Sequence, residues 1–198
     1  PLLQRLLDGP RKRVRALIVA PTRELAEQIH DDISKMAKQT GLRSISIYGG
    51  VGKHPQIRAI RNGVEIIVAC PGRLLDLLND RAFSLNAVEA LVLDEADRML
   101  DMGFIPDIEE IFKRTPFTRQ TLFFSATMAP EIERITNTFL SNPAKVEVAR
   151  AATTNVNIKQ GVVMFKGSAK PKEPTEKREL LRKLIDAEGD ARPRLPLR

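Results

Sequence analysis

Short apolar runs recur along this sequence, and each is followed at once by a polar or glycine-rich turn. The segments between the runs carry apolar residues at helical spacing, and each is long enough for one helix. Strands alternating with helices are typical of βα units, which build a parallel sheet covered by helices on both faces. We therefore predict an α/β fold, with strands over residues 16–20, 44–47, 65–69, 90–93 and 121–124.

Composition narrows the class of protein. Of the 198 residues, 42% are hydrophobic and 29% are charged, which excludes a disordered or collagen-like chain. No apolar run approaches the ~20 residues of a membrane-spanning helix, so we expect no membrane association. The single cysteine, Cys70, cannot form an internal disulfide and favours a reducing compartment, from which we predict a cytoplasmic location.

Charge is unevenly distributed along the chain. Residues 1–150 hold 21 Lys and Arg against 19 Asp and Glu, whereas residues 151–198 hold 11 against 6. A nearly neutral main body argues against wholesale coating of DNA, but it permits a local basic track for nucleic-acid phosphates.

Domain organisation follows from the pattern near residue 150. A strand is expected over 144–148, followed by a polar linker over 151–155. Beyond the linker we expect one strand over 158–165 and a charged amphipathic helix over 176–188, with Leu180, Leu181, Leu184 and Ile185 on its inner face. We interpret residues 1–150 as one domain and 151–198 as a linker and the opening of a second domain.

Two carboxylates, Asp94 and Glu95, directly follow the apolar run 90–93. In a doubly wound sheet, ligands bind beyond the carboxyl ends of the strands. There the first carboxylate can hold Mg²⁺ through water, and the second can orient or deprotonate a water that attacks a phosphoryl group. The alternative is that both residues only begin the next helix and interact with its positive end.

Hydroxyl groups and turn residues follow the other runs. Ser125 and Thr127 either cap the next helix or hydrogen-bond a neighbouring strand-end carboxylate such as Asp97. Pro21-Thr22-Arg23 and Pro71-Gly72-Arg73 each open a helix with free N–H groups and an arginine, and Gly49-Gly50 permits close backbone approach. Each has an ordinary explanation in turn chemistry, but together they indicate a track for a sugar-phosphate backbone.

Taken together, these motifs resemble those of DEAD-box RNA helicases. In the family's order and spacing they are Pro21-Thr22-Arg23-Glu24-Leu25, Gly49-Gly50, Pro71-Gly72-Arg73, Asp94-Glu95-Ala96-Asp97 and Ser125-Ala126-Thr127. Several such motifs in register are far more specific than any one of them. The resemblance covers about residues 1–165 and implies a RecA-like domain of an enzyme that uses ATP and Mg²⁺ to separate short RNA duplexes.

The resemblance also implies a role for each motif. Asp94 would hold Mg²⁺ through water, and Glu95 would activate the hydrolytic water. Asp97, Ser125 and Thr127 would couple the nucleotide state to RNA strand separation. RNA would be bound mainly through its sugar-phosphate backbone by Pro21, Thr22, Arg23, Gly49, Gly50, Pro71, Gly72 and Arg73.

Three features depart from the family pattern. The phosphate-binding loop Gly-x-x-x-x-Gly-Lys-Thr and the adenine-reading Gln motif do not occur, so the RecA-like domain is expected to be N-terminally truncated. The Arg-rich motifs of the second domain are also absent. Cys70 stands where the family usually has Thr. We therefore expect no ATP hydrolysis from this chain alone.

Three hypotheses remain open at this point. The chain is part of an ATP-dependent RNA helicase, a truncated non-catalytic RNA-binding module, or a nucleotide-driven motor on DNA. The Asp-Glu-Ala-Asp and Ser-Ala-Thr motifs favour RNA over DNA. The sequence names neither an RNA target nor protein partners in ribosome assembly or RNA decay.

Overall fold

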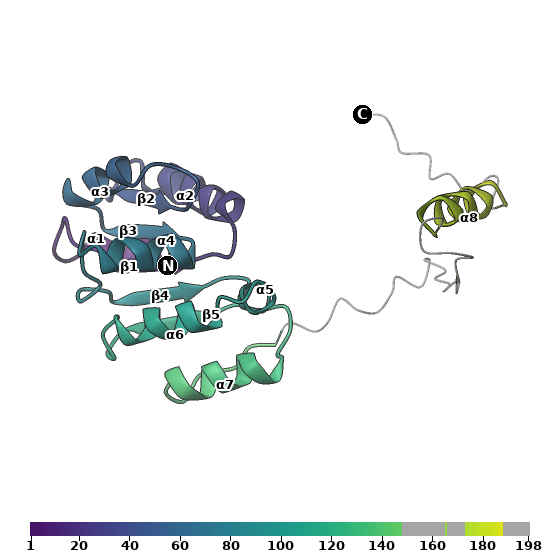
Figure 1. Cartoon of the computed structure of the whole chain (residues 1–198). Coiled ribbons are helices and arrows are strands. Elements are labelled where there is room, and N and C mark those ends of the chain that lie inside the picture. Colours follow the sequence, from purple (N-terminus) through teal and green to yellow (C-terminus); the bar gives the residue numbers. More distant parts are fainter. Residues whose placement is uncertain (148–164, 166–172, 188–198) are drawn as a thin grey trace. The chain divides into compact units, whose positions relative to one another are not determined.

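The computed structural model describes residues 1–147, residue 165 and residues 173–187 (Figure 1). Five strands form one parallel sheet: β1 (Ala16–Val19), β2 (Ser44–Ile47), β3 (Ile66–Ala69), β4 (Ala90–Leu93) and β5 (Gln120–Phe123). Their order across the sheet is β2-β3-β1-β4-β5, and every pairing is parallel. The predicted α/β fold and its five strands are confirmed.

Helices precede, connect and follow the strands. They are α1 (Leu2–Leu7), α2 (Arg23–Ala37), α3 (Lys53–Arg61), α4 (Pro71–Asn79), α5 (Ala96–Asp101), α6 (Ile105–Lys113), α7 (Pro130–Phe139) and α8 (Glu173–Ala187). Pro71 and Pro130 each occupy the first position of a helix, where the missing N–H of proline removes no hydrogen bond. The sheet and α1 to α7 belong to one unit, Pro1–Lys145, and the second unit is Val146–Arg198.

The core lies on both faces of the sheet. Leu17 and Val19 of β1 pack in one apolar cluster with residues of α4, α6 and α7, whereas Ala16 and Ile18 pack in the other with residues of α1 and α2. Because both faces of β1 are covered, all four of its residues are buried. This explains the continuous apolar run in the sequence, because apolar and polar residues would alternate along a strand that was exposed on one face.

The register of the sheet determines where the site lies. Val19 of β1 is paired with Ala69 of β3 and with Leu93 of β4, and Leu93 is paired with Phe123 of β5. These four strands therefore end level with one another. The residues that follow them must emerge along one edge, which is where the sequence analysis placed the functional motifs.

One predicted strand is not formed. Residues 144–147 adopt no regular structure, and Val146 is 86% exposed. The alternation of Lys145 and Glu147 with valines suits an edge strand, but such a strand needs a neighbour to pair with its backbone. Among the described residues, none forms a strand beside 144–147. Residue 148 lies outside the described residues.

The second unit is described only in part. The predicted linker over 151–155 and the strand over 158–165, except Phe165, lie outside the described residues. The predicted helix is present as α8, but Leu181 is 57% exposed and Leu184 is 41% exposed. The expectation of an inner face is wrong for these two leucines, whereas Leu180 is half-buried. The part of this unit that the structure describes provides no second element for them to pack against.

Candidate functional site

Backbone hydrogen bonds continue the sheet for one residue beyond its strands. Asp94 N donates to Val19 O at 3.0 Å, Ala20 N to Ala69 O at 2.9 Å, and Phe124 N to Leu93 O at 2.8 Å. These bonds hold the first residue of each turn in place. The motifs after β1, β3, β4 and β5 thus share one edge of the sheet, as their positions in the sequence predicted.

Asp94 and Glu95 form the turn between β4 and α5. The carboxylate of Asp94 accepts a hydrogen bond from the backbone N–H of Glu95 at 3.0 Å. Glu95 has φ 52° and ψ 52°, a left-handed conformation that few residues other than glycine adopt. Its side chain does not cap α5 and lies 3.5 Å from the guanidinium of Arg98. Glu95 is nevertheless the N-cap residue of α5, so its position fits both the start of a helix and a carboxylate directed at a water.

A magnesium ion is compatible with Asp94. Within the described residues, no group of three or more His, Cys, Asp or Glu side chains could enclose a metal. Mg²⁺ does not require such a cage, because it usually keeps several waters and binds through one or two carboxylates together with substrate phosphates. Asp94, half-buried at the rim of an apolar sheet, offers a hard oxygen ligand of this kind.

Asp97, Ser125 and Thr127 form a connected network between α5 and the turn after β5. Ser125 Oγ accepts a hydrogen bond from Asp97 N at 3.2 Å and donates to Thr127 O at 2.7 Å. The Asp97 carboxylate accepts from both the N–H and the hydroxyl of Thr127, at 3.0 and 3.2 Å. Neither hydroxyl caps α7, whose N-cap is Ala129. The structure thus shows the contact to Asp97 that the sequence analysis considered.

The start of α2 carries Pro21, Thr22 and Arg23. Pro21 is buried, and the hydroxyl of Thr22 caps the helix by accepting a hydrogen bond from Leu25 N at 3.3 Å. Arg23 is about half exposed, and its guanidinium lies 4.6 Å from the ring centroid of Tyr48. A cation held over an aromatic face keeps a defined direction while its N–H groups stay open to a ligand.

Tyr48 joins the turn after β2 to α2. Its hydroxyl donates a hydrogen bond to the Glu27 carboxylate, which also lies 3.4 Å from Arg23. This hydrogen bond raises the pKa of Tyr48 and lowers the pKa of Glu27. At neutral pH Tyr48 therefore remains a donor and Glu27 remains an anion, so both keep Arg23 in position.

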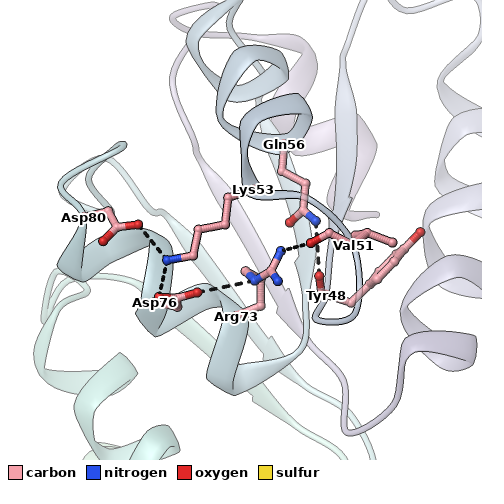
Figure 2. A network of polar contacts seen from close by, with 7 residues as sticks. All are labelled: Tyr48, Val51, Lys53, Gln56, Arg73, Asp76 and Asp80. Atoms are coloured by element: carbon pink, nitrogen blue, oxygen red, sulfur yellow. Dashed lines mark hydrogen bonds and ion pairs between the residues drawn. The ribbon is translucent and has the colours of Figure 1, made fainter.

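The turn over residues 48–52 contains Gly49 and Gly50, both exposed. Gly50 has φ +79°, a conformation in which a side chain would be strained. The turn's carbonyls face protein donors, since Gln56 Nε2 donates to Tyr48 O at 3.1 Å and Arg73 Nη1 to Val51 O at 2.9 Å (Figure 2). Among the described residues, none accepts a hydrogen bond from the N–H of Gly49 or Gly50. Exposed, unpaired N–H groups of this kind can bind an anion.

The start of α4 carries Pro71, Gly72 and Arg73. Pro71 is buried, Gly72 is exposed, and the Arg73 side chain is only 12% exposed. Arg73 Nε lies 3.5 Å from Asp76, so this arginine is held by protein groups on two sides. Cys70 precedes this helix, and burial raises the pKa of its thiol to about 11, with a smaller contribution from Glu24. Cys70 is thus a protonated thiol at neutral pH.

The sequence analysis missed the residues that support these arginines. They are Glu27, Tyr48, Lys53, Asp76 and Asp80. Two signals were available, because Glu27 follows Arg23 by four residues and Asp76 follows Arg73 by three, which are the spacings of helical ion pairs. Lys53 carried no such signal, since its partners lie on another helix.

Comparison with protein families shows which family this chain belongs to. Residues 1–135 match the family model described as DEAD/DEAH box helicase. The chain belongs to this family. The matched residues include all five motifs quoted from the sequence.

Relatives of this DEAD/DEAH box chain span bacteria and fungi. It is 45% identical over 149 residues to the ATP-dependent RNA helicase DBP3 of Debaryomyces hansenii, a match that covers 75% of this chain and 28% of DBP3. It is 40% identical over 189 residues to the ATP-dependent RNA helicase CshA of Listeria monocytogenes, covering 96% and 35%. The chain thus spans about a third of the length of these curated relatives.

Solved structures show the same fold. A DEAD box protein from the hyperthermophile Methanococcus jannaschii matches with a TM-score of 0.65 and 38% identity, covering 69% of this chain and 38% of that one. The yeast DEAD-box splicing factor Prp28 matches with a TM-score of 0.67 and 35% identity, covering 71% and 35%. The predicted RecA-like fold is therefore confirmed.

Proposed function

We propose that this chain is part of an ATP-dependent RNA helicase that couples ATP binding and hydrolysis to sequence-independent RNA binding and local duplex unwinding. The observation that carries the proposal is the shared edge of the sheet. There the turn of Asp94 and Glu95 is linked through α5 to the Asp97 network, beside two helix starts that each carry an arginine, of which Arg23 is about half exposed. Family membership and relatives named as ATP-dependent RNA helicases support the same activity.

Each carboxylate has a distinct proposed role. Asp94 would hold Mg²⁺ through water, and the ion would offset the negative charge of the phosphates. Glu95 orients the attacking water and accepts its proton on a carboxylate oxygen. Glu95 has a left-handed backbone in the turn that leads into α5. Strain of this kind is often kept where a side chain must be held in one direction.

The proposed coupling runs through Asp97, Ser125 and Thr127. Asp97 lies two residues after Glu95, on the first turn of α5. Any displacement of α5 caused by the nucleotide would change its hydrogen bonds to the turn after β5. These three residues are therefore proposed to transmit the nucleotide state to bound RNA, as the family resemblance implied.

The proposed RNA track consists of the start of α2, the glycine turn and the start of α4. Its members are Pro21, Thr22, Arg23, Gly49, Gly50, Pro71, Gly72 and Arg73. Arg23 and the free N–H groups of Gly49 and Gly50 offer donors to phosphate oxygens. Pro21, Pro71 and Thr22 contribute by setting the helix starts, because the prolines are buried and the Thr22 hydroxyl is occupied as a cap. Donors of this type read phosphate and not base sequence.

A second candidate is a non-catalytic RNA-binding module. It is favoured by one observation, that no Gly-x-x-x-x-Gly-Lys-Thr or Gly-x-x-x-x-Gly-Lys-Ser segment occurs among the 198 residues. Without such a cradle the triphosphate lacks its main backbone ligands. We accordingly propose that these 198 residues, taken alone, do not hydrolyse ATP. A cytoplasmic location remains our proposal, and within the described residues no helix is both long and apolar enough to cross a bilayer.

The test is RNA-stimulated ATP hydrolysis by the complete protein that carries this sequence, with Glu95→Gln as the variant. We expect hydrolysis to fall by about 10²-fold or more, because a positioned general base contributes that much, while RNA binding is kept. The matched control is Glu110→Gln on α6, whose carboxylate pairs with Arg114 away from the site. Hydrolysis that is absent in the parent protein, with RNA binding retained, would favour the second candidate.

A further inference from the structure

Lys53 is the first residue of α3 and follows the glycine turn directly. Its ammonium group lies 2.6 Å from the Asp76 carboxylate and 2.9 Å from the Asp80 carboxylate, both presented by α4 and the residue that ends it (Figure 2). These hydrogen bonds raise the pKa of Lys53. The lysine is therefore a permanent cation at neutral pH, with two of its three donors already used.

Asp76 joins Lys53 to Arg73. One of its oxygens receives the Lys53 ammonium, and the other lies 3.5 Å from Arg73 Nε. Arg73 in turn donates to the carbonyl of Val51 at 2.9 Å. The turn over residues 48–52 is thus tied to α4 twice, once through the Val51 carbonyl and once through Lys53 at its end (Figure 2).

We propose that Lys53, Asp76 and Asp80 form a clamp that positions the glycine turn and Arg73 relative to each other for binding an RNA backbone. This inference rests on the proposed function and assigns residues that no family motif in this sequence includes. Lys53 is a positioning residue in this clamp and not a phosphate ligand. Moving its ammonium to a phosphate would leave Asp80 without this partner, and Asp76 with Arg73 alone, beside a polyanion, which is electrostatically unfavourable.

The clamp and simple electrostatics make opposite predictions for Asp76. If Asp76 only contributed negative charge near the track, its removal would strengthen the attraction for phosphate. If it holds Lys53 and Arg73 in place, its removal frees both side chains and the turn, and binding then has to order them again. The sign of the change in RNA affinity therefore separates the two cases.

The experiment measures binding of a labelled single-stranded oligouridine by fluorescence anisotropy, using the complete protein that carries this sequence. We expect Asp76→Ala and Lys53→Met each to raise Kd about five- to tenfold, because binding then has to order at least one long side chain again. Lys53→Arg, which keeps the charge and the donors, should stay within about twofold of the parent. The matched controls are Asp32→Ala and Lys35→Met, which break an ion pair of 3.2 Å within α2.

Two further measurements distinguish positioning from direct contact or general damage. The RNA concentration for half-maximal stimulation of ATP hydrolysis should rise, while the maximal rate is unchanged, because the clamp does not touch the reacting atoms. For Lys53→Met, the slope of log Kd against log salt should match the parent, whereas loss of a phosphate contact lowers it by about 0.7. If Asp76→Ala does not fold, the binding measured with Lys53→Met tests the clamp by itself. The Lys53 side chain is 38% exposed, so its replacement leaves the core intact.

The possible results separate the clamp from the proposed function. Tighter or unchanged binding by the folded Asp76→Ala and Lys53→Met variants, with a parent that binds RNA, overturns the clamp alone. A lower salt slope for Lys53→Met overturns it as well, because it makes Lys53 a phosphate ligand. A parent protein that binds no oligouridine overturns the proposed function and the clamp with it.

Discussion

The carboxylate of Asp97 accepts two hydrogen bonds from Thr127, one from its backbone N–H at 3.0 Å and one from its hydroxyl at 3.2 Å. The two residues are thirty positions apart, and each lies just beyond the end of a strand. Adjacent parallel strands that end level with one another bring them together. This contact joins the carboxylate turn after β4 to the turn after β5.

The first prediction concerns this contact. Asp97→Ala removes the acceptor for both bonds, so we expect faster backbone hydrogen exchange over residues 125–129 and a stability loss of about 1 kcal/mol. In the complete protein, duplex unwinding should fall more than ATP hydrolysis. The matched control is Asp101→Ala, an exposed residue at the end of the same helix. Equal losses of unwinding and hydrolysis would contradict the coupling role.

The second prediction concerns the left-handed backbone of Glu95, with φ 52°. Because an L-residue with a side chain is destabilised there by roughly 1–2 kcal/mol, Glu95→Gly should be about 1 kcal/mol more stable than Glu95→Ala. That order is the reverse of the one expected inside a helix. Urea denaturation of the two variants measures the difference, and a more stable alanine variant would show that the turn is not strained.

The third prediction concerns Arg23. As a phosphate contact, Arg23→Ala should weaken binding equally for RNAs of different sequence and lower the salt slope by about 0.7. The matched control is Arg61→Ala. Arg61 is exposed at the C-terminal end of α3, whereas the glycine turn lies at its N-terminal end, so this variant removes the same charge away from the track and should leave the salt slope unchanged. A loss that depends on the RNA sequence would argue for base contacts instead.

The fourth prediction concerns the Cys70 thiol. Burial raises its pKa from 9.0 to about 11, so its alkylation by iodoacetamide should keep rising about tenfold per pH unit beyond pH 9 and level off only near pH 11. In the urea-unfolded chain the rate should level off near pH 9. The folded state holds the Cys70 proton more tightly than the unfolded chain does. The free energy of unfolding should therefore fall as the pH rises from 9 to 11. Identical folded and unfolded profiles would contradict this.

The buried strands are the part of the fold that the sequence predicts best. The apolar runs of β1 and β3 are continuous because helices cover both faces of the sheet, and such runs can be recognised locally. The failure at 144–147 has the opposite cause. Whether an alternating segment becomes a strand depends on a neighbour that pairs with its backbone, and no local pattern supplies that information.

The sequence by itself determined the class of fold, the five strands and the motifs at their ends, because periodicity, prolines at helix starts and glycines in turns act over a few residues. Only the tertiary structure decided which side chains support the motifs. Lys53 meets Asp76 and Asp80 because the segments that follow the paired strands β2 and β3 emerge at the same edge of the sheet, and Tyr48 meets Arg23 because α2 packs against β2. Such contacts depend on strand order and register, which follow from packing of the whole core and leave no signal in a local pattern.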